Sequence, residues 1–222
     1  MKFQGILPKT LKGMTFTMKI GLIALLLALP ISGTALADSA GSSMPPAGSV
    51  SKAEGLKAWQ RIEAVVTHPR CANCHVGPNN IPMWTISGEN KTRPHGMNIH
   101  AGDSRIGAET VSCVACHASS DTPNVAPHMP PHVGLPWQLA PVAFEWFEKT
   151  GTEICTQLRD PKRNGGRDAA GLVEHLHHDA KIKGFIPWAW VPGPGRSTPP
   201  GSFDTHVQDM TVWGAAGQPC PE

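Results

Sequence analysis

The sequence predicts a mainly α-helical protein with extensive irregular loops, and three observations support this prediction. Apolar side chains recur at helical spacing only in short segments. Proline and glycine are frequent, at 22 and 23 of 222 residues, so regular structure is expected to be sparse. The motif Cys-X-X-Cys-His occurs twice, at 71–75 and 113–117.

The first 37 residues have the features of a secretory signal peptide. Lys19 precedes an apolar run from Ile20 to Leu29, and Ala35-Leu36-Ala37 forms a small-residue cleavage site. The run is too short to cross a bilayer comfortably, although a retained N-terminal anchor is the alternative. We therefore expect a protein exported to the bacterial periplasm, without a membrane span after signal cleavage.

Removal of this segment changes the charge of the protein. The whole chain has a formal charge of +2, but four of its 19 Lys and Arg, and none of its 17 Asp and Glu, lie in residues 1–37. Residues 38–222 therefore carry 15 basic and 17 acidic side chains. This balance gives no reason to expect a nucleic-acid partner.

A linker and a helix are expected next. Residues 38–50 are rich in Ser, Gly and Pro, which predicts a flexible linker to one domain, 51–222. Ser51 and Glu54 have the spacing of a capping box, so a helix is expected from Ser51 to about Thr67. Four apolar residues fall on one face of this helix: Leu56, Trp59, Ile62 and Val66.

Each Cys-X-X-Cys-His motif has the spacing that c-type haem attachment requires. The two thiols can form thioethers to the two vinyl groups of one haem, and the histidine that follows supplies an axial imidazole to the iron. The expected attachment residues are Cys71, Cys74, Cys113 and Cys116, and the expected proximal ligands are His75 and His117. The prediction is therefore a fold of short helices wrapped around two covalently bound c-type haems. The haems would supply much of the apolar core, and the first helix would pack on the first porphyrin.

Two other interpretations of these cysteines are weaker. The two cysteine pairs of a zinc ribbon are about 15–20 residues apart, whereas 38 residues separate Cys74 from Cys113. Zinc also gives no reason for a histidine after both pairs. A thioredoxin-like redox pair needs a strand-to-helix context, which the segments before Cys71 and Cys113 do not supply.

The ligand on the opposite side of each iron separates electron transfer, which needs a saturated iron, from catalysis or ligand binding, which needs an open position. The long loop 76–112 can carry a ligand back onto the first haem. A helix expected from Asp168 to about Asp179 can present two histidines on one face. The candidate distal ligands are His95, Met97, His100, His175 and His178, with His128, Met129 and His132 less favoured. The number of well-placed histidines favours at least one bis-histidine haem.

Four arginines are candidate partners of the haem propionates, with ordinary surface positions as the alternative: Arg93, Arg105, Arg163 and Arg167.

Downstream of Pro136 we expect three short helical pieces. The first spans 141–150 and stops at Gly151. The second begins with Thr152 as its N-cap and ends at Asp160, and the third is the helix from Asp168. An irregular tail is expected beyond it, including Trp188 to Trp190 and the Pro/Gly run 192–201.

Two cysteines lie outside the motifs. In an oxidising compartment the simplest fate of Cys155 and Cys220 is to pair with each other. A bridge over this length of chain would contribute about 4 kcal/mol in the chain-entropy model. Haem attachment by a single cysteine is the alternative, but neither residue has a second thiol nearby.

Three stretches of the chain resemble a group of exported bacterial dihaem c-type cytochromes often described as a subunit of isoquinoline 1-oxidoreductase. They are Leu139-Ala-Pro, residues 154–167, and Trp188-Ala-Trp-Val-Pro-Gly, within a resemblance that covers most of 55–221. The resemblance implies association with a periplasmic molybdenum hydroxylase. This chain shows no molybdopterin or iron–sulfur domain, so it would be the electron-accepting partner.

The sequence thus favours an electron-transfer protein over an enzyme. Its two haems would relay electrons between redox partners in the periplasm, with a dehydrogenase or a molybdenum hydroxylase as donor. One alternative is a dihaem peroxidase-like enzyme with one five-coordinate haem, although such enzymes are generally larger and have a separate domain for each haem. The other is a haem-based ligand sensor.

Overall fold

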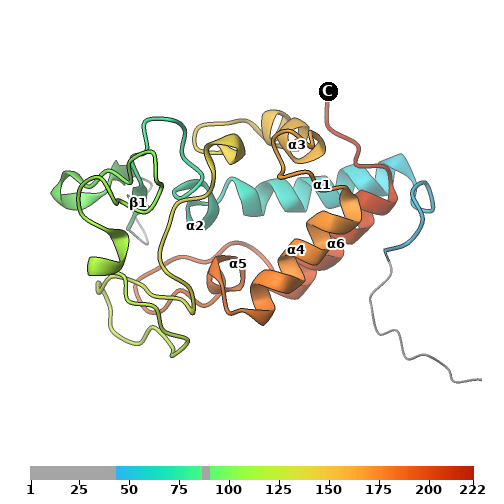
Figure 1. Cartoon of the computed structure of the whole chain (residues 1–222). Coiled ribbons are helices and arrows are strands. Elements are labelled where there is room, and N and C mark those ends of the chain that lie inside the picture. The colour runs from blue at the N-terminus through green and yellow to red at the C-terminus, as the bar shows by residue number, and fades with distance from the viewer. Residues whose placement is uncertain (1–43, 87–90) are drawn as a thin grey trace, which may run out of the picture. The chain divides into compact units, whose positions relative to one another are not determined.

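Helices supply most of the regular structure. The computed structural model describes residues 44–86 and 91–222, so the expected signal peptide and the first part of the expected linker lie outside the described residues. This described part contains six α-helices and one two-stranded sheet, joined by long irregular segments (Figure 1). The helix-rich fold with extensive loops is as the sequence predicts. None of these helices is both long and apolar enough to cross a membrane.

The α-helices are α1 (Lys52–Val66), α2 (Pro69–Ala72), α3 (Gly151–Arg159), α4 (Ala169–Lys181), α5 (Phe185–Trp188) and α6 (Phe203–Ala215). The antiparallel strands are β1 (Met83–Thr85) and β2 (Thr92–Pro94). Three single turns of 3₁₀-helix complete the elements: η1 (Gly96–Asn98), η2 (Cys113–Ala115) and η3 (Val142–Phe144).

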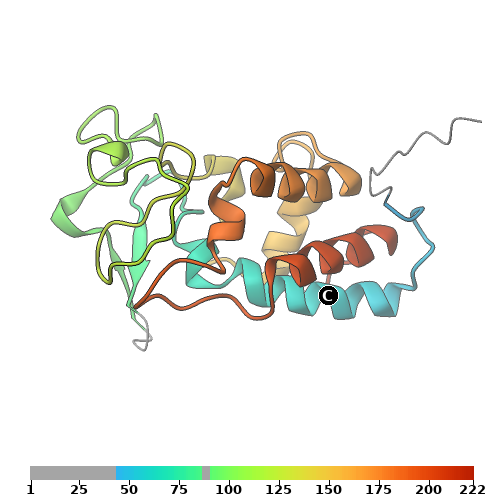
Figure 2. The same ribbon diagram turned by 90° about the horizontal axis from the view of Figure 1, so that it is seen from below.

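Four helices form a half of the protein with its own apolar core. Helix α1 lies along α6, α6 also packs on α4, and α3 packs on α1 (Figures 1 and 2). The apolar face of α1 is buried here, with the rings of Trp59 and Trp213 5.2 Å apart. The expectation that this face packs on a porphyrin is therefore wrong, because the neighbouring helices bury it without a cofactor. The core includes Ile62, Val66, Ile154, Leu158, Leu172, Leu176 and Met210.

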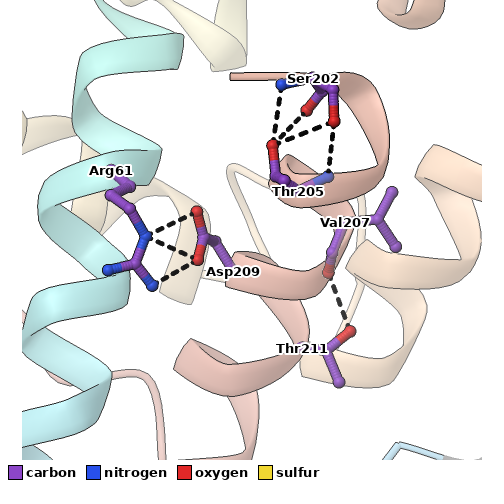
Figure 3. Close-up of polar contacts among 6 residues, drawn as sticks. All are labelled: Arg61, Ser202, Thr205, Val207, Asp209 and Thr211. Atoms are coloured by element: carbon purple, nitrogen blue, oxygen red, sulfur yellow. Dashed lines mark hydrogen bonds and ion pairs between the residues drawn. The ribbon is translucent and has the colours of Figure 1, made fainter. Parts of the chain in front are cut away.

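Polar contacts at the helix ends and flanks secure this helical half. Ser51 and Glu54 form the predicted capping box at the start of α1. Ser202 caps α6 in the same way, with Thr205 as its reciprocal partner (Figure 3). Between the two helices, the guanidinium of Arg61 donates to both carboxylate oxygens of Asp209 (Figure 3). Its Nε lies 2.9 Å from Oδ1 and 3.0 Å from Oδ2, and its Nη2 lies 2.5 Å from Oδ1.

The segment 141–150 differs from its prediction. It contains only the single turn η3, because the backbone N–H groups of Trp146 and Phe147 both donate to the carbonyl of His75, at 2.8 and 3.0 Å. These tertiary bonds replace helical ones. The next helix, α3, is capped by Thr150 with Glu153, so Gly151 is its first residue rather than a stop signal, and Thr152 is not the N-cap.

The C-terminal region is more helical than expected. Asp168 caps α4 as predicted, and its side chain accepts from the N–H of Gly171. The short helix α5 and the whole of α6 were not anticipated. The local signals for α6 are the cap at Ser202 and apolar residues three apart at Val207, Met210 and Trp213, which the proline-rich segment before them obscured.

The end of the expected linker lies against α6. The N–H of Gly48 donates to the carbonyl of Ala215 at 2.6 Å. A Cβ atom on Gly214 would meet the methyl carbon of Met44 at 1.9 Å, so glycine allows this close approach. Residues 44–50 are thus attached to the helical half.

Residues 71–86 and 91–147 form the other half, which is built mainly from loops and contains both motifs (Figures 1 and 2). Its apolar cluster is small, with Val76, Ala101 and Leu139 buried and Cys74, Met83 and Phe147 packed against them. Of ten large apolar side chains exposed in the described residues, eight lie between positions 84 and 142. This half therefore has apolar surface that its own side chains do not cover.

Arg105 holds several of these loops together. It is 8% exposed, and its guanidinium donates to the carbonyls of Val76, Gly77 and Ala140 and to the side chain of Asn80. These bonds occupy its donors. Arg105 is accordingly neither a surface arginine nor a free partner for a propionate.

Candidate haem-attachment site

The first motif lies in a tight helical turn. His68 caps α2 by accepting from the N–H of Arg70, and Pro69 occupies the first helical position. The N–H of Cys74 then donates to the carbonyl of Cys71 at 3.2 Å, which keeps the two residues within one turn. Both cysteines are unpaired and half-buried. Burial raises the pKa of the Cys71 thiol to about 12, and the nearby Cys74 adds to the effect.

The ring of His75 is held on two sides. Its Nδ1 atom lies 2.9 Å from the carbonyl oxygen of Phe144, and its plane is parallel to the indole of Trp146, with centroids 3.6 Å apart. A carbonyl can only accept, so Nδ1 carries the proton and Nε2 keeps its lone pair. Burial lowers the pKa of this imidazole to about 4, which keeps it neutral at ordinary pH. A neutral imidazole with a free Nε2 suits an iron ligand.

The second motif repeats this arrangement in a different chain segment. Its first three residues form η2, and the N–H of His117 donates to the carbonyl of Cys113 at 2.9 Å. His117 Nδ1 lies 2.8 Å from the carbonyl oxygen of Pro131, and its ring stacks on Trp137 at 4.4 Å. Cys113 is half-buried and Cys116 is exposed. Each motif therefore offers two free thiols and one oriented imidazole.

The two motifs are close to each other. Burial raises the pKa of the Cys74 thiol, and the charge of Cys113 is among the further causes. Arg70 and Arg196 also lie in this region. Burial is the main cause of the lowered pKa of Arg70 and of His117, and the positive charge of Arg196 adds to both shifts. Neither arginine forms an ion pair with a carboxylate among the described residues. The region between the motifs thus holds positive charge without an acidic partner.

Buried donors without acceptors surround the motifs. The indole N–H of Trp146, which stacks on His75, has no partner in the described residues. The indole N–H of Trp188 and the Nε of Arg70 are likewise buried and unpaired, and the Arg70 guanidinium carbon lies 6.0 Å from the Trp188 ring centroid. Leaving such a donor without an acceptor costs about 1–3 kcal/mol. A bound group with anionic oxygens and a large apolar surface, as haem has, fits both these donors and the uncovered apolar surface.

The zinc interpretation of the cysteines can be compared with their positions in the structure. All four lie in the described residues, and no group of three or more His, Cys, Asp or Glu in this part of the chain gathers as a metal site. Zinc needs four protein ligands in a structural site. A haem iron takes four of its ligands from the porphyrin, so one or two protein ligands suffice.

The candidate distal ligands have different surroundings. His95 follows β2, and its ring centroid lies 6.2 Å from that of His117. This position relates His95 to the second motif, whereas the sequence suggested the first. His175 on α4 is half-buried, and its charge is a minor cause of the lowered pKa of His75, which burial dominates. Met97 is 79% exposed, and His178 is exposed on α4.

The remaining candidates have other contacts or lie at the surface. His100 is half-buried, and its carbonyl accepts from the hydroxyl of Thr110 at 3.1 Å. His128 and Met129 are exposed, and His132 Nδ1 lies 3.2 Å from the carbonyl oxygen of Ser120.

The other predicted propionate partners have structural contacts. Arg163 donates to the carbonyl of Ala143 at 3.0 Å, and Arg167 to that of Asn164 at 2.9 Å. The guanidinium carbon of Arg93 lies 5.8 Å from the Trp84 ring centroid. Arg70 also donates to a carbonyl, that of Thr85, and Arg196 donates to those of Pro192 and Met129. These two arginines, which the sequence analysis did not single out, are nevertheless the better candidates, because they lie beside the motifs and pair with no carboxylate among the described residues. The one signal in the sequence for such a role was that Arg70 directly precedes Cys71.

A disulfide joins Cys155 on α3 to Cys220 in the C-terminal tail, in agreement with the pairing that the sequence favours. Cys155 is fully buried in the helical core. The bridge connects residues 65 apart and holds the tail beyond α6 against α3.

Two surface hollows, of about 340 and 510 Å³, are lined by other parts of the chain, and no residue of either motif lines them. The first lies around Ser119, Gly134 and Lys183, and the second between α1 and α6.

No family model, no curated protein and no solved structure matches this chain significantly. The assignment of the candidate site therefore rests on the chemistry and geometry of this chain alone.

Proposed function

We propose that this chain is an exported dihaem c-type cytochrome that relays electrons in the bacterial periplasm. Cys71 and Cys74 would hold one haem and Cys113 and Cys116 the other, with His75 and His117 as proximal ligands. When bound, each haem supplies a one-electron couple. The chain's own residues orient the ligands and balance the charge of the propionates.

The observation that carries this proposal is the repeated environment of the two histidines. In each motif Nδ1 faces a backbone carbonyl, at 2.9 Å for His75 and 2.8 Å for His117, and a tryptophan stacks on the ring. A hydrogen bond from the other ring nitrogen to a carbonyl fixes the tautomer and the direction of a metal-binding imidazole. Two unrelated loops, ending at Phe144 and Pro131, supply the carbonyls. Two histidines that are buried only by packing have no reason to share this arrangement.

A relay also needs the two haems near each other and a positive environment for their propionates. The thiols of Cys74 and Cys113 are close enough to interact electrostatically, which supports the first requirement. Arg70 and Arg196 support the second, because an arginine binds a carboxylate through several N–H donors at once.

The proposed electron donor is a periplasmic dehydrogenase or a molybdenum hydroxylase. This part of the proposal rests on the resemblance of residues 139–141, 154–167 and 188–193 to exported dihaem cytochromes. The chain itself would not transform an organic substrate.

The test is expression of the full chain in a bacterium with and without the c-type haem maturation system. We expect a periplasmic product that stains for covalent haem and whose mass exceeds that of the processed polypeptide by two haems. The double substitution C71S/C74S should remove one of them, as should C113S/C116S, and all four substitutions should remove both. Mature protein without covalent haem, under conditions that mature a control cytochrome, would refute the proposal.

Function is then tested by mixing the reduced and oxidised holoprotein with redox partners. Reduction by a co-purifying dehydrogenase, together with reoxidation by another periplasmic cytochrome, is the expected result. Peroxidase turnover, or carbon monoxide binding to either haem, would instead favour the enzyme or the sensor.

A further inference from the structure

His95 and His117 come from separate parts of the chain, and their rings lie close together. His95 follows β2 directly, and its backbone N–H donates to the carbonyl of Pro82 at 2.8 Å, which ties it to the β1–β2 hairpin. His117 ends the second motif. Their ring centroids are 6.2 Å apart, with 61° between the planes.

Both rings are oriented in the same manner. His95 Nδ1 lies 2.9 Å from the carbonyl oxygen of Gly96, and His117 Nδ1 lies 2.8 Å from that of Pro131. Each Nδ1 therefore carries the proton, since a carbonyl only accepts. The Nε2 atom of each ring makes no hydrogen bond among the described residues. Two lone pairs available for a metal are thus present in one small region.

The spacing matches two imidazoles on opposite sides of one metal ion. A metal–nitrogen distance of about 2 Å on each side places the two ring centroids roughly 6 Å apart. Edge-to-face ring contacts also occur at this separation, but they do not require that both Nδ1 atoms be held by carbonyls. For comparison, the packed pair His75 and Trp146 has its centroids only 3.6 Å apart.

We propose that His95 is the distal axial ligand of the second haem, opposite His117. This inference rests on the proposed function, because it assumes that the second motif carries haem. It makes that haem bis-histidine and six-coordinate, hence closed to small ligands and lower in potential than a His/Met haem. The loop after the first motif then serves the second haem, and any open iron belongs to the first haem alone.

The test compares H95A with wild type and with H177A, which removes an exposed histidine of α4. In H95A we expect one of the two haems to become high-spin in its absorption and electron paramagnetic resonance spectra and to bind carbon monoxide. Added imidazole should restore the low-spin spectrum. H177A should match wild type.

Single-haem variants identify which iron His95 serves. In C71S/C74S, which keeps the second haem, H95A should convert all the haem, whereas in C113S/C116S it should convert none. The reverse pattern would overturn the assignment, as would an H95A protein whose haems both stay low-spin with two haems attached. Wild type that carries no covalent haem would instead refute the proposed function. Haem content is measured separately from the spin state, so the two failures can be distinguished.

A measurement on protein that keeps His95 covers the case in which H95A does not accumulate. Near-infrared magnetic circular dichroism distinguishes bis-histidine from His/Met and from five-coordinate ferric haem. A bis-histidine signal for the second haem is expected in C71S/C74S, and its absence there overturns the inference.

Discussion

The imidazole of His75 lies parallel to the indole of Trp146, with 1° between the planes and 3.6 Å between the centroids. Trp146 also packs against the helical core, so it links the first motif to the half of the protein that has its own apolar core. The position of the His75 ring is therefore coupled to the packing of the helical half.

Replacing Trp146 should affect both properties. We expect W146L to lower the free energy of unfolding by about 3 kcal/mol, as large-to-small changes of a packed aromatic do, and to shift the electron paramagnetic resonance signal of the first haem only. W84L is the control, because Trp84 is 40% exposed in β1. Equal effects of the two substitutions would contradict the coupling.

The ion pair between Arg61 and Asp209 should stabilise the contact of α1 with α6. The arginine side chain is 58% exposed and that of Asp209 13%, so solvent screens the pair in part. We expect R61A to cost about 1–2 kcal/mol, mostly because it leaves a largely buried carboxylate without its donors. A double-mutant cycle with D209A, measured by urea unfolding, should give a coupling energy of about 1 kcal/mol. K52A on the same helix should change little, and a coupling near zero would show that the pair adds nothing.

His206 should make stability depend on pH. It is 6% exposed on α6, its Nδ1 has no partner in the described residues, and burial lowers its pKa to about 4, with Asp209 opposing the shift. In the unfolded chain the pKa is about 6.5, so the unfolded state binds more protons at acid pH. Folding stability is therefore lost as pH falls below about 6.5, and the loss stops below about pH 4.

This loss can be measured by urea unfolding of wild type and H206Q at about pH 7.5 and pH 5. Between these values His206 should cost wild type about 2 kcal/mol, and the variant should lose less by that amount. The comparison removes the contributions of the other histidines, which both proteins share. Parallel stability curves would show that His206 is not the group responsible.

The disulfide should contribute most of its stability through the unfolded chain. It closes a loop between residues 65 apart, for which the chain-entropy model gives about 4 kcal/mol. We expect C155A/C220A to lower the free energy of urea unfolding by about that amount without loss of haem. A reductant should lower the midpoint of wild type similarly and leave the variant unchanged, since the thioethers are not reducible. A variant as stable as wild type would indicate that the reduced chain retains compact structure there.

Features that depend on short stretches of chain were determined by the sequence itself. The covalent chain sets the spacing of the thiols and the imidazole within 71–75 and 113–117. The caps at Ser51 and Asp168 require only residues three apart. Hence the two motifs could be recognised, and the start of α1 and the start of α4 could be predicted, without a structure. The helix α6 had equally local signals, at Ser202 and along one apolar face, but they followed a proline-rich segment that pointed to an irregular tail.

Only the tertiary structure decided which distant residues meet. The segment 141–150 is not helical because its N–H groups bond to His75, and the face of α1 is covered by α6 rather than by a cofactor. His95 lies nearer in sequence to the first motif than to the second, yet its ring lies beside His117. Such contacts depend on the summed packing of segments far apart in the chain, whereas caps and motif spacings depend on a few neighbouring bonds.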